Sequence, residues 1–207
     1  LWFLACSDDM NAAIVAARGV RPLVALVLDG TESQKDHAVK ALNSLSSNKA
    51  ARLVIEDAGG VPPLVRLMRM GIKHTSGGTL VGYTYPRPLY GDDDIEDDRF
   101  TNAVCALSNL SLSENSSHII ADEGGVPELV HLMEGISQQE RECALITLVR
   151  VTAHKWLGLD ILQEGGIPTL VAFIRDGTEK QKENAASVLG NLADKNDDYR
   201  NAIEDAG

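Results

Sequence analysis

The feature that most constrains this chain is a phrase that it repeats. The segment EDAGGVPPLVRLMR at 56–69 returns as ADEGGVPELVHLME at 121–134 and as LQEGGIPTLVAFIR at 162–175. An internal period of about 20–50 residues is typical of repeat proteins, in which each repeat is one supersecondary unit that cannot bury its apolar face alone. Neighbouring repeats must therefore stack, and we predict a single solenoid domain over residues 1–207.

Equivalent positions in this phrase set the boundaries of the repeats. Val20, Val61, Val126 and Ile167 occupy one place in it and are 41, 65 and 41 residues apart. The spacing predicts a partial repeat at 1–18, full repeats at 19–59, 60–124, 125–165 and 166–207, and an insertion at about 71–98. The chain also begins inside an apolar run without an initiator Met, which suggests a segment of something longer.

Each repeat predicts three helices, and glycine and proline mark the first two. A short helix ends in a sequence such as VIEDAG, and the glycine that follows permits the left-handed backbone of a helix C-cap. The second helix begins near a proline, where a missing backbone N–H costs nothing, and ends in a glycine turn. The prolines are Pro62, Pro127 and Pro168, and the turn glycines are Gly30, Gly135 and Gly177. In the last repeat, the predicted buried face of the second helix consists of Leu170, Val171 and Ile174.

The third helix carries a capping box and an apolar stripe. The boxes are TESQ from Thr31, SQQE from Ser137 and TEKQ from Thr178, in which two side chains satisfy each other's backbone N–H groups. Thr147 is the polar member of the stripe, and we expect its hydroxyl to bond a carbonyl one turn back. The predicted stripes are Ala38, Ala41, Leu42 and Leu45; Ala103, Ala106, Leu107 and Leu110; Ala144, Thr147, Leu148 and Val151; and Ala185, Val188, Leu189 and Leu192.

The chain resembles the armadillo repeat family over essentially its whole length. The resemblance lies in the repeat period, the three-helix pattern and sequences such as GGVPPLV and DGTEKQKENAASVLGNLA. The resemblance implies an all-α fold, a right-handed superhelical solenoid of three-helix armadillo repeats. It also implies a concave groove, lined by the third helices, that binds extended peptides. Armadillo repeats occur in nuclear import receptors, adhesion and signalling scaffolds, vacuolar scaffolds and ubiquitin ligases, so the resemblance does not select one activity.

The resemblance also implies which residues line the groove. In armadillo proteins that resemble import receptors, a ladder of Asn near the end of the third helix grips the peptide backbone, and Trp one turn earlier stacks on Lys stems. The Asn positions correspond here to Ser44, Asn109, Arg150 and Asn191. The Trp positions correspond to Lys40, Cys105, Ile146 and Ser187, and none of them holds Trp. These eight residues form the predicted peptide groove.

Energetics weaken the prediction of an import receptor for basic cargo. One hydrogen bond contributes about 0.5–1.5 kcal/mol net, so two Asn supply at most about 3 of the roughly 8 kcal/mol of a micromolar complex. Asn109 and Asn191 have an alternative role, in which each bonds the backbone of the neighbouring repeat or faces water. The guanidinium of Arg150 favours an acidic or phosphorylated segment, which it can hold bidentately, although a salt bridge to a nearby carboxylate is the simpler interpretation.

Composition excludes several classes of function. The formal net charge of −11 and the lack of a basic patch argue against nucleic acid and favour attraction of basic protein segments. Cys6, Cys105 and Cys143 are odd in number and lack CxxC spacing, which indicates neither disulfides nor zinc and favours an intracellular location, in the cytoplasm, the nucleus or both. We expect Cys105 and Cys143 to be small buried residues. No run approaches the roughly 18–20 apolar residues of a membrane span.

Catalysis has little support in the sequence, and no cofactor is indicated. The five histidines lack HExxH spacing. The acidic DDDIEDD at 92–98 lacks the Gly that a calcium loop needs at its sixth position, where Asp97 stands. We predict instead a solvated insertion, with a basic partner or a lid over the groove as alternatives. The prediction is a non-enzymatic protein-binding scaffold; a receptor for basic cargo and the substrate-recruiting arm of a ubiquitin ligase are the alternatives.

Overall fold

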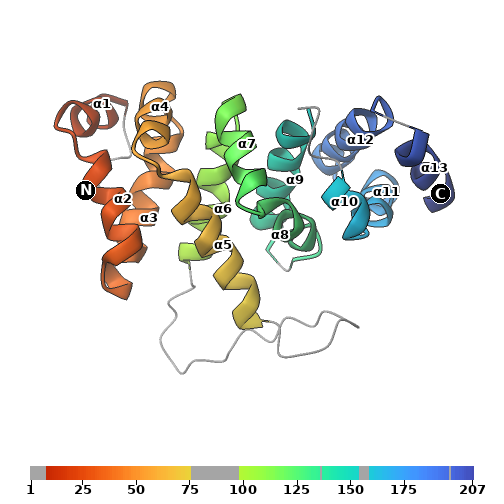
Figure 1. Cartoon of the computed structure of the whole chain (residues 1–207), viewed down its shortest axis with the longest axis horizontal. Coiled ribbons are helices and arrows are strands. Elements are labelled where there is room, and N and C mark those ends of the chain that lie inside the picture. Colours follow the sequence, from red (N-terminus) through yellow and green to blue (C-terminus); the bar gives the residue numbers. More distant parts are fainter. Residues whose placement is uncertain (1–7, 76–97, 136, 154–158, 196) are drawn as a thin grey trace. The chain divides into compact units, whose positions relative to one another are not determined.

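The computed structural model describes residues 8–75, 98–135, 137–153, 159–195 and 197–207, and these residues form helices and no strand (Figure 1). The prediction of an all-α fold is confirmed. The chain divides into two compact units, Leu1–Leu110 and Ser111–Gly207.

The first unit contains two second helices, two third helices and two short helices. Its helices are α1 (Asp8–Ala16), α2 (Val20–Asp29), α3 (Glu32–Ser46), α4 (Lys49–Asp57), α5 (Val61–Thr75) and α6 (Asp98–Leu110). The third helices α3 and α6 pack side by side, and each also packs on the second helix before it (Figure 1). The first five residues of the expected insertion, 71–75, are the end of α5, while residues 76–97 lie outside the described residues.

The second unit repeats the same order of short, second and third helices. Its helices are α7 (Glu114–Asp122), α8 (Gly125–Leu132), α9 (Gln138–Thr152), α10 (Leu159–Gln163), α11 (Gly166–Asp176), α12 (Glu179–Ala193) and α13 (Asp197–Ala206). Here the third helices α9 and α12 pack against each other. Each unit therefore sets two third helices next to one another, which is the arrangement that positions the candidate site.

The apolar stripes of the third helices form the core, as predicted. All sixteen stripe residues are buried, and the least buried of them, Leu189, is only 7 % exposed. The one polar member, Thr147, donates its hydroxyl to the carbonyl oxygen of Cys143 at 2.7 Å, one turn back. Because the bond is satisfied inside its own helix, the hydroxyl does not disturb the apolar packing.

Helix starts also follow the predicted capping. Thr31 and Thr178 each form a complete capping box, with Gln34 and Gln181 as the reciprocal partners. Ser137 accepts a hydrogen bond from the backbone N–H of Glu140. Each prolyl residue named above lies in the first turn of α5, α8 or α11, where no backbone N–H is needed.

The Gly-Gly pairs before the second helices have two separate reasons. Gly59, Gly124 and Gly165 adopt left-handed φ values of 70°, 71° and 69°, which glycine tolerates best. At the second position, a Cβ on Gly60 would lie 2.6 Å from Ile55 Cγ2, and one on Gly166 would lie 3.1 Å from Val130 Cγ1. The first glycine of a pair thus serves backbone conformation and the second serves close packing.

The predicted buried face of α11 is only partly correct. Leu170 is fully buried, but Val171 is only half-buried and Ile174 is 41 % exposed. The equivalents of Ile174 in the other repeats, Val27, Met68 and Met133, are buried. Within the described residues no second helix of a further repeat follows α11, so one side of Ile174 is left uncovered.

Candidate functional site

The eight predicted groove residues lie on four third helices, two in each unit. In the first unit, α3 carries Lys40 and Ser44, and α6 carries Cys105 and Asn109. Residues four apart lie one turn apart on the same side of a helix. Lys40 and Ser44 hold in α3 the positions that Cys105 and Asn109 hold in α6, and we call these four positions the third-helix face of the first unit.

The third-helix face of the second unit has the same construction. Here α9 carries Ile146 and Arg150, and α12 carries Ser187 and Asn191. Ser187 is exposed and the other three residues are half-buried. The hydroxyl of Ser187 donates to the carbonyl oxygen of Glu183 at 2.9 Å.

Cys105 differs from the other seven residues because its side chain is buried, with 8 % exposed. It lies in α6 as the small buried residue that the sequence led us to expect, and it offers a ligand little surface. Cys143, in contrast, is half-buried rather than buried, and among the described residues neither cysteine forms a disulfide.

Asn109 is held by a hydroxyl on the preceding third helix. Its Nδ2 donates to Ser46 Oγ at 3.0 Å. The hydroxyl of Ser46 in turn donates to the carbonyl oxygen of Asn43 at 2.6 Å. Ser46 is fully buried, so this acceptor has a fixed place at the end of α3.

Asn191 makes the corresponding contacts in the second unit. Its Nδ2 donates to the carbonyl oxygen of Val149 at 3.1 Å and to Thr152 Oγ1 at 3.2 Å. The alternative role considered from the sequence, a bond to the backbone of the neighbouring repeat, is therefore confirmed for Asn191. Thr152 is fully buried, and its hydroxyl donates to the carbonyl oxygen of Leu148 at 2.7 Å.

Arg150 occupies the same position in the repeat between these two asparagines. Its Nη1 donates to Ser111 Oγ at 3.4 Å. The acceptor is again a buried hydroxyl, which is 2 % exposed. The guanidinium is half-buried and carries its charge on the third-helix face of the second unit.

Sequence reasoning missed the three hydroxyl residues Ser46, Ser111 and Thr152. Each stands two residues after an Asn-ladder position, in three successive repeats, and the equivalent residue in the last repeat is Ala193. A Ser or Thr that recurs at one place in an otherwise apolar helix end was the signal available. Its meaning depends on the residue of the next repeat, which the pattern within one helix does not show.

A contact between two side-chain amides also joins the third helices of the first unit. Asn43 Nδ2 donates to Asn102 Oδ1 at 2.8 Å, between α3 and α6. In the second unit the equivalents of Asn43 and Asn102 are Val149 and Asn184. The Nδ2 of Asn184 is buried without a hydrogen-bond partner, as expected when the facing position holds an apolar side chain.

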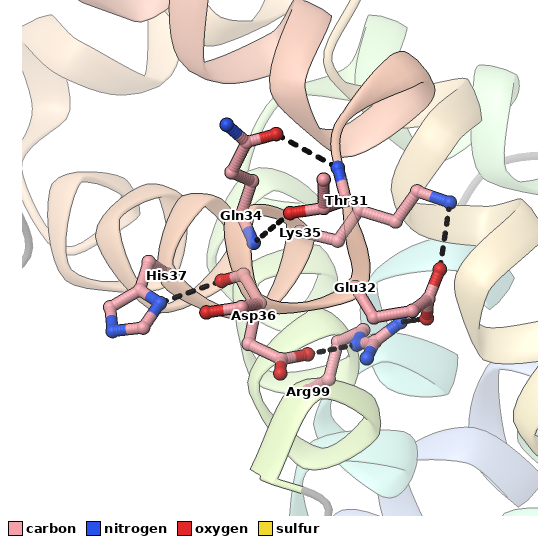
Figure 2. Close-up of polar contacts among 8 residues, drawn as sticks. Thr31, Glu32, Gln34, Lys35, Asp36, His37 and Arg99 are labelled. Carbon is pink, nitrogen blue, oxygen red and sulfur yellow. Dashed lines mark hydrogen bonds and ion pairs between the residues drawn. The ribbon is translucent and has the colours of Figure 1, made fainter.

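A charged cluster joins the starts of α3 and α6 (Figure 2). Arg99 Nη1 lies 2.6 Å from Glu32 Oε2, Arg99 Nε pairs with Asp36, and Lys35 Nζ lies 3.2 Å from Glu32 Oε1. Hydrogen bonds from Arg99 and Lys35 hold the pKa of Glu32 below its usual value. Burial alone would lower the pKa of Arg99, but its hydrogen bonds to both carboxylates outweigh burial and raise it.

Evidence for metal binding or membrane insertion is absent from the ranges that the structure covers. They contain no group of three or more His, Cys, Asp or Glu side chains placed to hold a metal ion. No helix among them combines the length and apolar character that crossing a membrane requires. The acidic segment weighed for calcium lies at 92–98, of which 92–97 fall outside the described residues.

Comparison with known proteins matches one of the repeats to a known family. A family model described as "Armadillo/beta-catenin-like repeat" matches residues 159–194. A curated relative, U-box domain-containing protein 45 of Arabidopsis thaliana, is 26 % identical over 209 residues, which cover 91 % of this chain and 27 % of the relative. The chain thus spans about a quarter of that relative's length.

Solved structures share the fold over the full length. The designed armadillo repeat protein YIII(Dq)4CqI has a TM-score of 0.74 and 22 % identity, covering 100 % of this chain and 78 % of that one. The designed armadillo repeat protein YIII(Dq.V1)4CPAF, solved in complex with peptide (KR)4, has a TM-score of 0.71 and 21 % identity, covering 99 % and 77 %. A family model for the armadillo repeat matches one repeat, and the three-helix repeats of both units share the fold of solved armadillo repeat proteins, so the chain has the armadillo repeat fold.

Proposed function

We propose that this chain is a non-enzymatic scaffold that binds an extended segment of a partner protein on its third-helix faces. The observation that carries the proposal is the equal placement of Asn109, Arg150 and Asn191 near the ends of successive third helices, where all three are half-buried rather than fully buried. The designed armadillo protein of similar fold in complex with peptide (KR)4 supports it by analogy.

The charge of the chain favours different ligands at different places. A formal net charge of −11 attracts basic segments in general. Arg150 brings a local positive charge to the second unit and favours a carboxylate or phosphate there. A basic segment with an acidic or phosphorylated residue opposite Arg150 satisfies both preferences.

A second candidate function is the substrate-recruiting arm of a ubiquitin ligase. The similarity to a U-box domain-containing protein over 91 % of this chain favours it. Under this proposal the same faces bind the substrate, and the catalytic domain lies outside residues 1–207. A receptor for basic cargo has less support, because none of its four Trp positions holds Trp. Either candidate is consistent with the intracellular location that we propose.

A peptide-array screen tests the proposal. We would probe the chain with basic, acidic and phosphorylated extended peptides at two salt concentrations, together with the double variant Asn109→Ala/Asn191→Ala and the single variant Arg150→Ala. Asn201→Ala is the matched control, because Asn201 is an exposed Asn on α13. We expect the double variant to lose most of the binding and the control to keep it.

The outcomes separate the alternatives. Capture of Lys-rich peptides that weakens steeply with salt would favour a receptor for basic cargo. Preference for acidic or phosphorylated peptides that Arg150→Ala abolishes would support a scaffold that uses this guanidinium. If the double variant binds as well as the unchanged chain, the third-helix faces are not the binding surface.

A further inference from the structure

A buried hydroxyl accompanies three of the four Asn-ladder positions. Asn109 donates to Ser46, Arg150 donates to Ser111, and Asn191 donates to Thr152. In each pair the hydroxyl belongs to the preceding repeat and lies two residues after that repeat's own ladder position. One contact of this kind would be incidental, but the same contact in three successive repeats indicates a rule of construction.

The geometry determines which way each asparagine amide is turned. The partner of Asn191 includes the carbonyl oxygen of Val149, which has no proton to give, so the group that faces it must be the NH₂. The hydroxyl proton of Ser46 is used on the carbonyl of Asn43, so Ser46 can only accept from Asn109. Both amides therefore direct their NH₂ toward the preceding repeat.

The opposite end of each amide is available to a ligand. From the part of the chain that the structure describes, the Oδ1 atoms of Asn109 and Asn191 receive no hydrogen bond, and neither atom is buried. An amide oxygen that is open to solvent accepts hydrogen bonds and donates none. Each asparagine thus presents an acceptor. Asn191 gives both amide protons to Val149 and Thr152, whereas Asn109 keeps one N–H besides its bond to Ser46.

We propose that Ser46, Ser111 and Thr152 are positioning residues that hold Asn109, Arg150 and Asn191 in one orientation. The chemistry of the ligand follows, an inference that rests on the proposed peptide binding: a segment that contacts the open Oδ1 of Asn109 in the first unit, or that of Asn191 in the second, must offer it an N–H group. Backbone N–H groups and the side chains of Lys and Arg meet this requirement, whereas a proline at either contact does not.

The positioning can be tested on the free protein. Three-bond couplings to the side-chain carbon of Asn109, measured by NMR on labelled chain, report whether its χ1 angle is fixed. We expect a single rotamer in the unchanged chain, averaging in Ser46→Ala, and recovery in Ser46→Thr, because Thr152 shows that this position accepts a threonine. Ser47→Ala is the control, since Ser47 bonds the carbonyl of Ser44 and receives nothing from Asn109.

The same variants are then titrated with the peptide (KR)4 and with an (SE)4 octapeptide. Loss of one hydrogen bond corresponds to about a two- to tenfold weaker Kd, and we expect this loss for (KR)4 in Ser46→Ala but neither in Ser46→Thr nor in Ser47→Ala. An unchanged Asn109 rotamer in Ser46→Ala overturns the positioning role. A changed rotamer with no binding of either peptide supports the positioning role and counts against peptide binding itself.

Discussion

At the scale of single residues, Asn109 and Asn191 differ in the acceptors that hold them. The main-chain carbonyl of Val149 can never donate a hydrogen bond, whereas the hydroxyl of Ser46 can give up its bond to the Asn43 carbonyl and donate to a carboxylate instead. Replacing Asn191 by Asp therefore sets a carboxylate against a carbonyl dipole, while Asp at 109 can be satisfied by the serine hydroxyl. We expect Asn191→Asp to lower the free energy of unfolding by about 2 kcal/mol and Asn109→Asp by about 1 kcal/mol or less.

Urea unfolding at neutral pH measures this difference, with Asn201→Asp as the control for charge alone, because Asn201 is exposed. Equal losses in the two variants would show that the identity of the acceptor has no effect on stability.

The position before each second helix supplies another prediction at this scale. Arg18, just before the first full repeat, holds the place that Gly59, Gly124 and Gly165 hold later, and it adopts a left-handed φ of 58°. Such a backbone costs a residue with a Cβ about 1–2 kcal/mol, partly offset by the extra unfolded-state freedom that glycine brings. We expect Arg18→Gly to raise the free energy of unfolding by about 0.5–1 kcal/mol.

Two glycine variants serve as controls for that reasoning. A Cβ on Gly59 would meet nothing within 4 Å, so Gly59→Ala should cost about 1 kcal/mol through φ alone. A Cβ on Gly60 would lie 2.6 Å from Ile55 Cγ2, so Gly60→Ala should cost about 2–3 kcal/mol. If the midpoint of urea unfolding falls in Arg18→Gly, strain at this position is not what limits stability.

At the scale of the elements, the charged cluster of Figure 2 makes the packing of α3 and α6 depend on pH. The pKa of Glu32 is lowered in the folded chain by Arg99 and Lys35. Because the pKa of Glu32 is lower in the folded chain than in the unfolded chain, the ion pair stabilises the fold at pH values above the unfolded pKa. This stabilisation is lost as the pH falls through the folded pKa. We therefore expect the acid side of the stability profile, below about pH 4.5, to flatten in Arg99→Met.

The effect should be small because Glu32 is fully exposed, and it should shrink further at high salt. Thermal unfolding across pH 3 to 6, roughly the range in which carboxylates titrate, measures it in the unchanged chain and in Arg99→Met. Arg175→Met is a suitable control, since the pair of Arg175 and Asp176 is local to α11. If thermal stability falls with decreasing pH equally in the unchanged chain and in Arg99→Met, the charged cluster is not the cause of that fall.

Helices and their stripes could be predicted from the sequence because their signals are local. The capping box at Thr31 and the stripe from Ala185 to Leu192 each lie within one helix, where spacing and side-chain chemistry suffice. Ile174 and the hydroxyl of Ser46 could not be read in this way. Whether Ile174 is covered depends on a neighbouring repeat, and the role of Ser46 depends on Asn109, 63 residues later.

The candidate site follows the same division. The positions of Asn109, Arg150 and Asn191 were predictable because each is defined by its place in a repeat. The direction in which each side chain points was not, because it is decided by Ser46, Ser111 and Thr152 on the preceding helix. In a repeat protein, the sequence therefore predicts which residues hold equivalent positions. It predicts less readily how their side chains are oriented and which atoms they offer to a ligand.

At the scale of the whole molecule, the chain consists of two compact units, each with its own buried stripes and its own complete capping box. In repeat proteins, stability is approximately a sum of terms for single repeats and their neighbours. Local opening should therefore report the unit in which a contact is lost, because cooperative openings involve contiguous segments. Thr31 in the first unit and Thr178 in the second provide a matched pair, since both accept from the backbone N–H of a glutamine three residues later.

Removing one cap costs about 1 kcal/mol, which corresponds to about fivefold faster hydrogen exchange by opening. We expect Thr178→Ala to accelerate exchange in α12 and α9 and to leave α3 protected, and Thr31→Ala to accelerate exchange in α3 and α6 and to leave α12 protected. The serine variants of both positions should exchange as slowly as the unchanged chain, because serine keeps the capping oxygen. If either alanine variant accelerates exchange equally in α3 and α12, the chain opens as one cooperative body, and its two units share a single stability rather than two.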